Sequence, residues 1–559
     1  MSATTNLLAM VPATAAALFE SVATRIRGRE RALAVTLAIT LPALRLALKI
    51  VSGRILANRV RFTNGDRPYL PPIIRWYHRY LWGVVFLVVS DGTGSFVKWH
   101  RRHLDHGRMY MSAGMFGAPA LVLADPKALH AILSGNAYRF AKPKELQKGI
   151  ARFTGHHGLL VLEGDEHKKH RRIITPVFNM NVLKKLIPVM DHALDELAGI
   201  IDHADAEDKT VEFQALSTAL TLNVIGRTAL ATDFDALNQT KQNPLFEAYE
   251  KLLSLFGLHT WAIVRAFVPL AIHLPVKANT DVMESRAFVF GEVEAIVRKL
   301  QAGGGANSEQ YVQDSLANVL QQNQLRDNGA SGSDGVLNAE DIRDEMLTFL
   351  VAGHETTSNA LSMGLYFLAK HPAAQEKLAT ALLQLPEPVA IDDLLKLPEL
   401  TNVINETLRM HSPAFVTRRE ALHDSTVPMS DGRSLFIPKG LDIVIPIQAM
   451  HLHPDVFPNP DTFDPDRWNS IHIAGQEKPA GSAEILHELH PMEFLPFLAG
   501  PRACIGRQFA LMELRVFLAR LLRDYSVSLG PNQGAPKIQY TLTAKPKALD
   551  LRFERRGRQ

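Results

Sequence analysis

Residues 497–506 of the chain read FLAGPRACIG and hold its single cysteine, Cys504. Two glycines and a proline place this cysteine in a tight, irregular loop, and a helical pattern follows at once over 507–522. A helix N-terminus stabilises negative charge, and its backbone N–H groups can hydrogen-bond a thiolate. An isolated cysteine is most often an inert, buried thiol. This setting instead indicates a thiolate metal ligand, with Gly500 and Gly506 letting a flat ligand approach the backbone closely.

These ten residues resemble the F-x-x-G-x-R-x-C-x-G haem-binding signature of the cytochrome P-450 family at every fixed position. Four further segments resemble family motifs in the same order and spacing: GDEHKKHRR at 164–172 (the helix that contacts the haem propionates), AGHETT at 352–357 (oxygen activation), ETLR at 406–409 (E-x-x-R) and FDPDRW at 463–468. The resemblance runs from about residue 95 to the C-terminus. One departure is His167, where the family often has Trp, although an imidazole N–H can also donate to a carboxylate.

The resemblance implies a mainly α fold with a minor β region, in which the haem lies between a central oxygen-activating helix and the loop and helix of Cys504. The residue pattern points the same way. Helical periodicity dominates 182–410, whereas extended segments occur at 120–124, 435–447 and 540–551. Asn338 followed by Asp341 predicts a capped start for the central helix, which should run to near Lys370. The Gly- and Ser-rich stretch 301–335 is expected to be a surface excursion within one domain, 95–559.

Site roles follow from the resemblance, residue by residue. Cys504 is the expected iron ligand, and Thr356 with Glu355 form the expected catalytic pair, which delivers a proton to the bound oxygen. Thr356 on its own would be expected only to hydrogen-bond the carbonyl of Ala352, one turn earlier. The expected haem-binding residues are His167, Arg171, Arg419, Arg502, Gly353 and Phe497. Among them, Gly353 is expected to leave room for dioxygen, since glycine in mid-helix costs about 1 kcal/mol relative to alanine.

Glu406 and Arg409 stand three residues apart on one helix face. By themselves they indicate an exposed ion pair worth a few tenths of a kcal/mol. The resemblance implies instead a buried triad with Arg467 that supports the Cys504 loop. Either role is structural.

Cysteine ligation predicts O–O cleavage chemistry, because a thiolate pushes electron density onto haem iron. The expected activity is that of a haem-thiolate monooxygenase with haem b, which inserts one oxygen atom of O2 into a lipophilic substrate such as a terpenoid, fatty acyl chain or polyketide. Only 55 residues follow Cys504, too few for a flavin domain, so electrons from NADPH are expected to arrive through a separate NADPH-cytochrome P-450 reductase or a cytochrome b-type donor. Exposed basic residues are expected to dock that partner or simply to be solvated: Lys168, Lys169, Arg172 and Arg507.

Two other functions remain open at this stage. A haem-thiolate isomerase or dehydratase would need neither O2 nor reductase, but such members commonly lose the acid–threonine pair that Glu355 and Thr356 preserve. A non-catalytic haem-binding protein is the third reading. Substrate contacts are expected at 139–160, 244–278, the start of the central helix, 414–417 and 541–544.

The first 94 residues are expected to attach the protein to a membrane. Residues 1–61 carry nine basic and two acidic side chains, a net charge of +7, while the rest of the chain carries −3. Uncharged runs at 1–19, 32–44 and 80–90 are too short or too broken for a clean spanning helix of about 20 residues. They favour interfacial or embedded helices at the endoplasmic reticulum, with the catalytic domain in the cytosol. A mitochondrial transit peptide and ordinary soluble helices are the alternatives. Basic residues spread over one recognition face are absent, so no nucleic-acid partner is expected.

Overall fold

The computed structural model describes residues 58–68, 108–113, 119–238, 244–254, 277–301, 337–475 and 487–557, together with residues 55, 97, 101 and 104. Its longer helices are α5 (Lys144–Thr154), α6 (Gly164–Ile174), α8 (Ile187–Ala206), α9 (Phe213–Ala229), α10 (Pro244–Ser254), α12 (Lys277–Gln301), α15 (Ala339–Lys370), α16 (Pro372–Leu383), α18 (Pro398–Met410) and α20 (Arg507–Asp524). Shorter helical segments are α4 (Pro126–His130), η4 (Ala131–Gly135), η5 (Ala137–Arg139), η6 (Thr175–Phe178), α7 (Met180–Lys184), α17 (Ile391–Lys396), α19 (Ile447–His451), η9 (Pro465–Asn469) and η10 (Gly500–Arg502).

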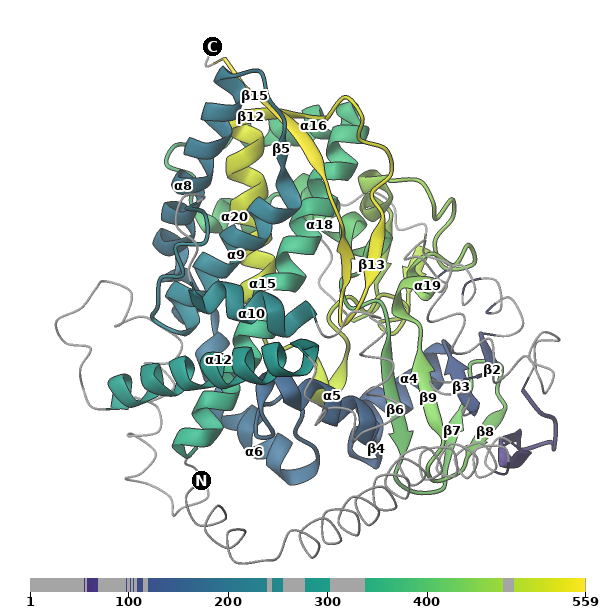
Figure 1. Ribbon diagram of the computed structural model, residues 1–559. Coiled ribbons are helices and arrows are strands. Elements are labelled where there is room, and N and C mark those ends of the chain that lie inside the picture. Colours follow the sequence, from purple (N-terminus) through teal and green to yellow (C-terminus); the bar gives the residue numbers. More distant parts are fainter. Residues whose placement is uncertain are drawn as a thin grey trace, which may run out of the picture.

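The strands form small sheets beside the helices (Figure 1). The largest sheet has the order β2 (Met109–Ala113), β3 (Pro119–Leu123), β9 (Asp442–Ile445), β6 (Thr417–Ala421), β4 (Phe140–Ala141), with β3 and β9 parallel and the other neighbours antiparallel. Two three-stranded sheets have the orders β1 (Arg61–Phe62), β8 (Ser434–Ile437), β7 (Ser425–Pro428), and β12 (Tyr525–Leu529), β15 (Asp550–Arg555), β5 (Val211–Glu212). The two pairs are β10 (Ile471–Ile473) with β11 (His487–Leu489), and β13 (Ile538–Tyr540) with β14 (Ala544–Pro546).

Helix α15 is the axis of the molecule and runs through its centre (Figure 1). Its 32 residues span about 48 Å at 1.5 Å per residue. The predicted start is confirmed, because Asn338 caps the helix and forms a reciprocal capping box with Asp341. Almost every side chain from Asp344 to Ala369 is buried, so this helix is stabilised by packing on all sides.

Among the described residues, two large hydrophobic cores and two small clusters hold the fold together. The larger one joins α8, α9, α15, α18 and α20, and the second lies under the five-stranded sheet and the β1–β8–β7 sheet. Val60 and Phe62 are buried in this second core, and β1 pairs with β8. Part of the region 1–94 therefore packs into the folded body, while the boundary at residue 95 stays a prediction.

The mainly α fold with a minor β region is confirmed. Among the residues described, no helix has the length and apolar character that crossing a bilayer requires. The uncharged runs 1–19, 32–44 and 80–90 lie outside the described residues, as do 302–335 of the predicted surface excursion and most of the expected substrate segment 244–278.

Candidate active site

The cysteine loop is shaped by contacts with the rest of the fold. Gly500 has a φ of +70°, and a Cβ at this position would lie 2.0 Å from the carbonyl oxygen of Leu133 in η4. Glycine is thus required here for its positive φ and for its close packing against the backbone of Leu133. The reason expected from the sequence was a different one, the close approach of a flat ligand. Gly506 is the N-cap of α20, and a Cβ there would make only ordinary contacts, 3.9 Å from Phe178 and 4.0 Å from Cys504 Sγ. The Cys504 N–H donates to Phe497 O over 2.8 Å.

Cys504 is accessible to solvent although it lies deep within the protein. Burial raises the pKa of its thiol, while the backbone N–H of Gly506 and the positive charges of Arg171 and Arg507 act in the opposite direction. The accessible surface of this thiol leaves it open to a ligand. Metal coordination deprotonates a thiol outright, so the raised pKa is compatible with ligation.

Helix α15 is accessible at one point along its buried length. Ala352 is exposed and Gly353 and Thr356 are half-buried, in the middle of an otherwise buried helix. Ala352 and Thr356 stand four residues apart and share a face. The Thr356 hydroxyl donates to Ala352 O over 2.8 Å, so the back-bond considered from the sequence is present. Glu355 beside it is buried, at 7% exposure.

The glycine in this motif has a packing role that the sequence did not indicate. A Cβ on Gly353 would lie 2.8 Å from Cδ1 of Ile225 on α9. The missing side chain therefore lets α9 and α15 approach each other. The room for dioxygen that we expect beside this glycine stays a prediction.

A buried cluster of positive charge lies near the cysteine loop. Arg419 and Arg502 are 2% and 9% exposed, and Lys142 adds a third cation. The one carboxylate among them is Glu163, which pairs with Arg502 and with Lys142 Nζ at 3.3 Å. Burial lowers the pKa of Lys142 to about 8 and that of Arg419 to about 10, and the mutual repulsion of the cations contributes.

His167 and Arg171 extend this cluster from helix α6. His167 is 2% exposed, and its Nδ1 lies 3.1 Å from the hydroxyl of Tyr138. Burial, followed by the charges of Arg502, Lys142 and Arg171, lowers the pKa of His167 to about 3, so the imidazole is neutral at physiological pH. Arg171 Nη1 donates to Ala503 O over 2.5 Å, which ties α6 directly to the cysteine loop.

This arrangement fits a haem. Counted with Arg171, the described cations of this cluster outnumber Glu163, so positive charge is left over for the two propionates of a haem. Arg502 also has buried Nε and Nη1 atoms with no hydrogen-bond partner among the described residues. The donor set, a lone cysteine thiol with a cationic cluster beside it, is the chemistry that a thiolate-ligated haem requires. The cluster would hold the propionates, and the iron bound by Cys504 would supply oxygen activation.

The sequence pointed to His167, Arg171, Arg419 and Arg502 but missed their neighbours Lys142, Glu163 and Tyr138. Glu163 immediately precedes the GDEHKKHRR motif, which is the one local signal that marked it. Lys142 and Tyr138 carry no such signal, because only the tertiary structure brings η5 and β4 to this motif.

A second buried pair joins the same helix α6 to α15. His170 Nδ1 lies 2.7 Å from Glu345 Oε1, and the two side chains are 2% and 0% exposed. Burial raises the pKa of Glu345, opposed by its contact with His170. The pair holds α6 at a set distance from α15.

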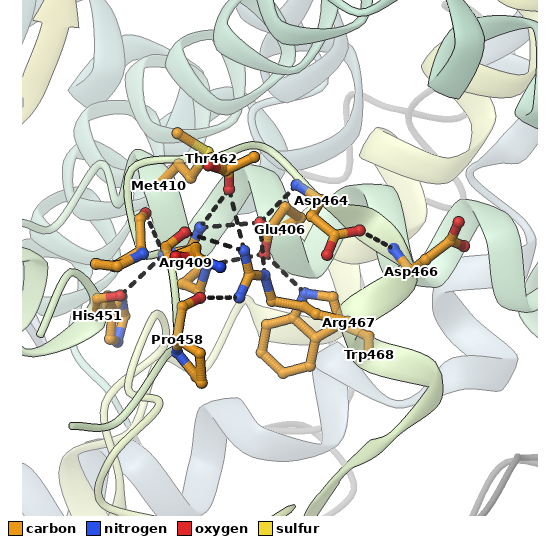
Figure 2. A network of polar contacts seen from close by, with 12 residues as sticks. Glu406, Arg409, Met410, His451, Pro458, Thr462, Asp464, Asp466, Arg467 and Trp468 are labelled. Atoms are coloured by element: carbon orange, nitrogen blue, oxygen red, sulfur yellow. Dashed lines mark hydrogen bonds and ion pairs between the residues drawn. The ribbon is translucent and has the colours of Figure 1, made fainter. Parts of the chain in front are cut away.

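The buried triad implied by the resemblance is confirmed by its contacts (Figure 2). Glu406 and Arg409 are fully buried and form a bidentate pair, with both N–O distances at 2.8 Å. Glu406 Oε1 also accepts from Arg467 Nε at 3.0 Å and from the Asp464 N–H at 2.9 Å, and Oε2 accepts from Trp468 Nε1 at 3.1 Å. The carboxylate thus receives five hydrogen bonds and fastens α18 to η9.

His451 carries this network to the cysteine loop. Its carbonyl accepts from Arg409 Nη1 at 3.1 Å, and its ring Nε2 accepts from the Leu495 N–H at 2.9 Å. Leu495 stands two residues before Phe497, so the anchored segment leads straight into the loop. Burial lowers the pKa of His451 to about 3, which keeps the ring neutral and able to accept.

Comparison with known proteins agrees with this geometry. Residues 77–553 match the family model described as Cytochrome P450. The chain belongs to the cytochrome P450 family. It is 28% identical to "Cytochrome P450 monooxygenase sphH" of Aspergillus fumigatus over 446 residues, which cover 76% of this chain and 77% of that one. It is 31% identical to "Leukotriene-B4 omega-hydroxylase 3" of Mus musculus, covering 78% and 80%.

A solved cytochrome P450 has the same fold. The crystal structure of the cytochrome P450DA heme domain superposes with a TM-score of 0.69 at 23% identity, covering 88% of this chain and 98% of that one. The family resemblance noted from the sequence is therefore confirmed. As a P450, the chain is an oxygen-incorporating oxidoreductase, and its family uses haem iron, O2 and electrons from a reductant.

Proposed function

We propose that this P450 inserts one atom of O2 into a lipophilic substrate, using haem b ligated by Cys504 and electrons from NADPH through a separate reductase. The observation that carries the proposal is the pairing of an accessible thiol at Cys504 with the opening of α15 at Ala352 and Thr356. Arg419, Arg502 and His167 hold the propionates in this proposal, with Arg171 holding the cysteine loop.

Proton delivery is assigned to Thr356 and Glu355. The Thr356 hydroxyl donates its hydrogen bond to Ala352 O. The lone pairs of its oxygen are therefore available to accept a hydrogen bond from an ordered water. Glu355, buried beside it, supplies an acid. An isomerase or dehydratase needs neither group, so the presence of Thr356 at the opening with Glu355 next to it in the sequence favours the monooxygenase.

A lipophilic substrate is supported by the walls of the expected contact segments. Leu146, Leu160 and Leu542 are partly buried and pack against a small apolar cluster of α5 and Val161. The leukotriene-B4 omega-hydroxylase among the relatives is named for a lipid. We therefore assign the substrate to apolar compounds of the terpenoid, fatty acyl or polyketide type.

A carbon monoxide difference spectrum tests the haem ligation. The reduced wild-type protein should show the strongly red-shifted Soret band of a thiolate-ligated haem, and Cys504→Ser should lose it. Reconstitution with NADPH and a P450 reductase then separates oxygenase from isomerase, because an isomerase would turn over without either. A wild-type spectrum of the histidine-ligated type would refute the proposal.

We place the protein at the endoplasmic reticulum membrane, anchored by residues 1–94, with the exposed Lys168, Arg172 and Arg507 facing the redox partner. Support comes from the +7 charge of residues 1–61 and from the relation to eukaryotic P450s. Fractionation of a green fluorescent protein fused behind residues 1–94 measures the attachment. Microsomal pelleting is the expected result, and a soluble or mitochondrial fusion would contradict the placement.

A further inference from the structure

The β13–β14 hairpin contacts α15 one turn beyond Thr356, next to the proposed place of the chemistry. Ala352, Thr356 and Asn359 recur at i, i+4 and i+7 and so lie on one stripe of the helix. The stripe is open at Ala352 and Thr356, but Asn359 is 0% exposed. Asn359 stands one turn from Thr356, which is about 5 Å along the axis. The opening on α15 therefore ends at the residue that the hairpin contacts.

A relay of amides and hydroxyls makes this contact. Asn359 Nδ2 donates to Thr543 Oγ1 in the hairpin turn over 3.1 Å. Asn359 Oδ1 accepts from Gln214 Nε2 of α9 over 3.0 Å, and the same nitrogen lies 3.3 Å from Thr218 Oγ1. All four side chains are at most 5% exposed. The relay thus connects α9, α15 and the turn without any charged group.

The turn carries an apolar side chain, Leu542, that contacts residues from two separate hydrophobic clusters. Leu542, next to Thr543, packs against both the large core and the small cluster around Ile150, Ala151 and Val161. Further contacts hold the residues directly beside the turn, since His411 Nε2 lies 2.8 Å from Ala544 O and Tyr540 packs edge-on against Phe415. The relay through Thr543 is therefore one of several contacts that hold the turn.

We propose that Asn359 is a positioning residue that sets, through Thr543, where Leu542 closes the substrate chamber beside Thr356. An asparagine suits this task because its amide donates to the turn while it accepts from α9, so its rotamer is determined at both ends. Side chains in such satisfied buried networks are held in one geometry. Because Leu542 is next to Thr543, its position is fixed by the same network. The inference rests on the proposed apolar chamber and adds the residue that sets its end wall.

Hydrogen–deuterium exchange of the haem-loaded protein tests the relay. Thr543→Val keeps the side-chain shape and removes the acceptor, so amide exchange within 538–546 should accelerate about five-fold, as the loss of one buried hydrogen bond predicts. Thr543→Ser restores the hydroxyl and should restore slow exchange. The matched control is Ser217→Ala, which removes the buried 2.7 Å bond to Ser362 between the same two helices away from the hairpin. Equal loosening of 538–546 in Ser217→Ala, or none in Thr543→Val, would overturn the inference.

Spectral titration of the same variants reads the chamber itself. Imidazole is too small to contact the proposed wall at Leu542, whereas econazole is a bulky apolar imidazole that is expected to contact it. Thr543→Val should weaken econazole binding at least about two-fold relative to imidazole, because the positioned Leu542 side chain is what the larger probe contacts. Thr543→Ser and Ser217→Ala should keep the wild-type ratio, and an unchanged ratio in Thr543→Val counts against the inference. If imidazole did not change the spectrum of the wild-type protein, the proposed haem site would be refuted. The hydrogen–deuterium exchange data would then still test the relay independently.

Discussion

Replacing Glu406 by Gln tests whether the buried ion network supports the cysteine loop. The substitution keeps the shape of the side chain but removes its charge and turns one acceptor oxygen into an N–H2 group. Oε1 now accepts three hydrogen bonds and Oε2 accepts two, so at least two donors lose their acceptor. The guanidinium groups of Arg409 and Arg467, whose side chains are 0% and 8% exposed, lose their counter-charge.

The expected loss is about 3–5 kcal/mol in the free energy of unfolding, the range found when one partner of a buried pair is removed. Native domains have only about 5–15 kcal/mol in total. Much of the Glu406→Gln protein should therefore fail to fold around its haem. Because the network continues through His451 to Leu495, the fraction of chains that retain haem should fall together with the stability.

Two measurements on purified protein follow this change: haem content per polypeptide, and urea unfolding monitored by tryptophan fluorescence. The control is Lys377→Ala, which breaks the exposed 2.5 Å pair with Asp466 on the same η9 segment. Exposed pairs contribute about 0–1 kcal/mol, so this variant should resemble wild type. If Glu406→Gln retained wild-type haem and unfolded at the wild-type urea concentration, the network could not be a structural support.

Two further predictions concern proton delivery and pH. Thr356→Ala should leave haem content and the carbon monoxide spectrum unchanged, because the side chain ligates nothing. It should lower the amount of product formed per NADPH consumed, because the missing electrons appear as peroxide or water. An unchanged ratio of product to NADPH would remove Thr356 from the proton path. Burial lowers the pKa of His354 and His411 to about 4 and that of His451 to about 3, all below the unfolded value of 6.5. The unfolded chain then binds more protons below pH 6.5, so each histidine should reduce the free energy of unfolding by about 1 kcal/mol per pH unit on acidification from 6.5 toward 4. Urea unfolding at pH 7, 6 and 5 measures the slope, and a flat profile would contradict it.

Much of the local structure was predictable from neighbouring residues. The capping pair Asn338 and Asp341 begins the central helix, the glycine-rich loop leads into α20, and Thr356 back-bonds to Ala352. These features depend on groups a few residues apart, so short-range geometry decides them. The triad of Glu406, Arg409 and Arg467 was reached only through the family resemblance.

The tertiary structure alone decided which distant groups meet. Lys142 and Glu163 lie beside Arg502, Gly353 faces Ile225, and Asn359 contacts Thr543 across 184 positions of the chain. Spacing along the chain carries no information about such encounters, because they depend on how whole helices and sheets pack. The amino-acid sequence by itself indicated the cysteine loop, the central helix and the class of chemistry. Packing determined the charged cluster beside that loop, the close contacts at Gly353 and Gly500 and the position of the β13–β14 turn, since only a folded core fixes distances between segments that no local rule connects.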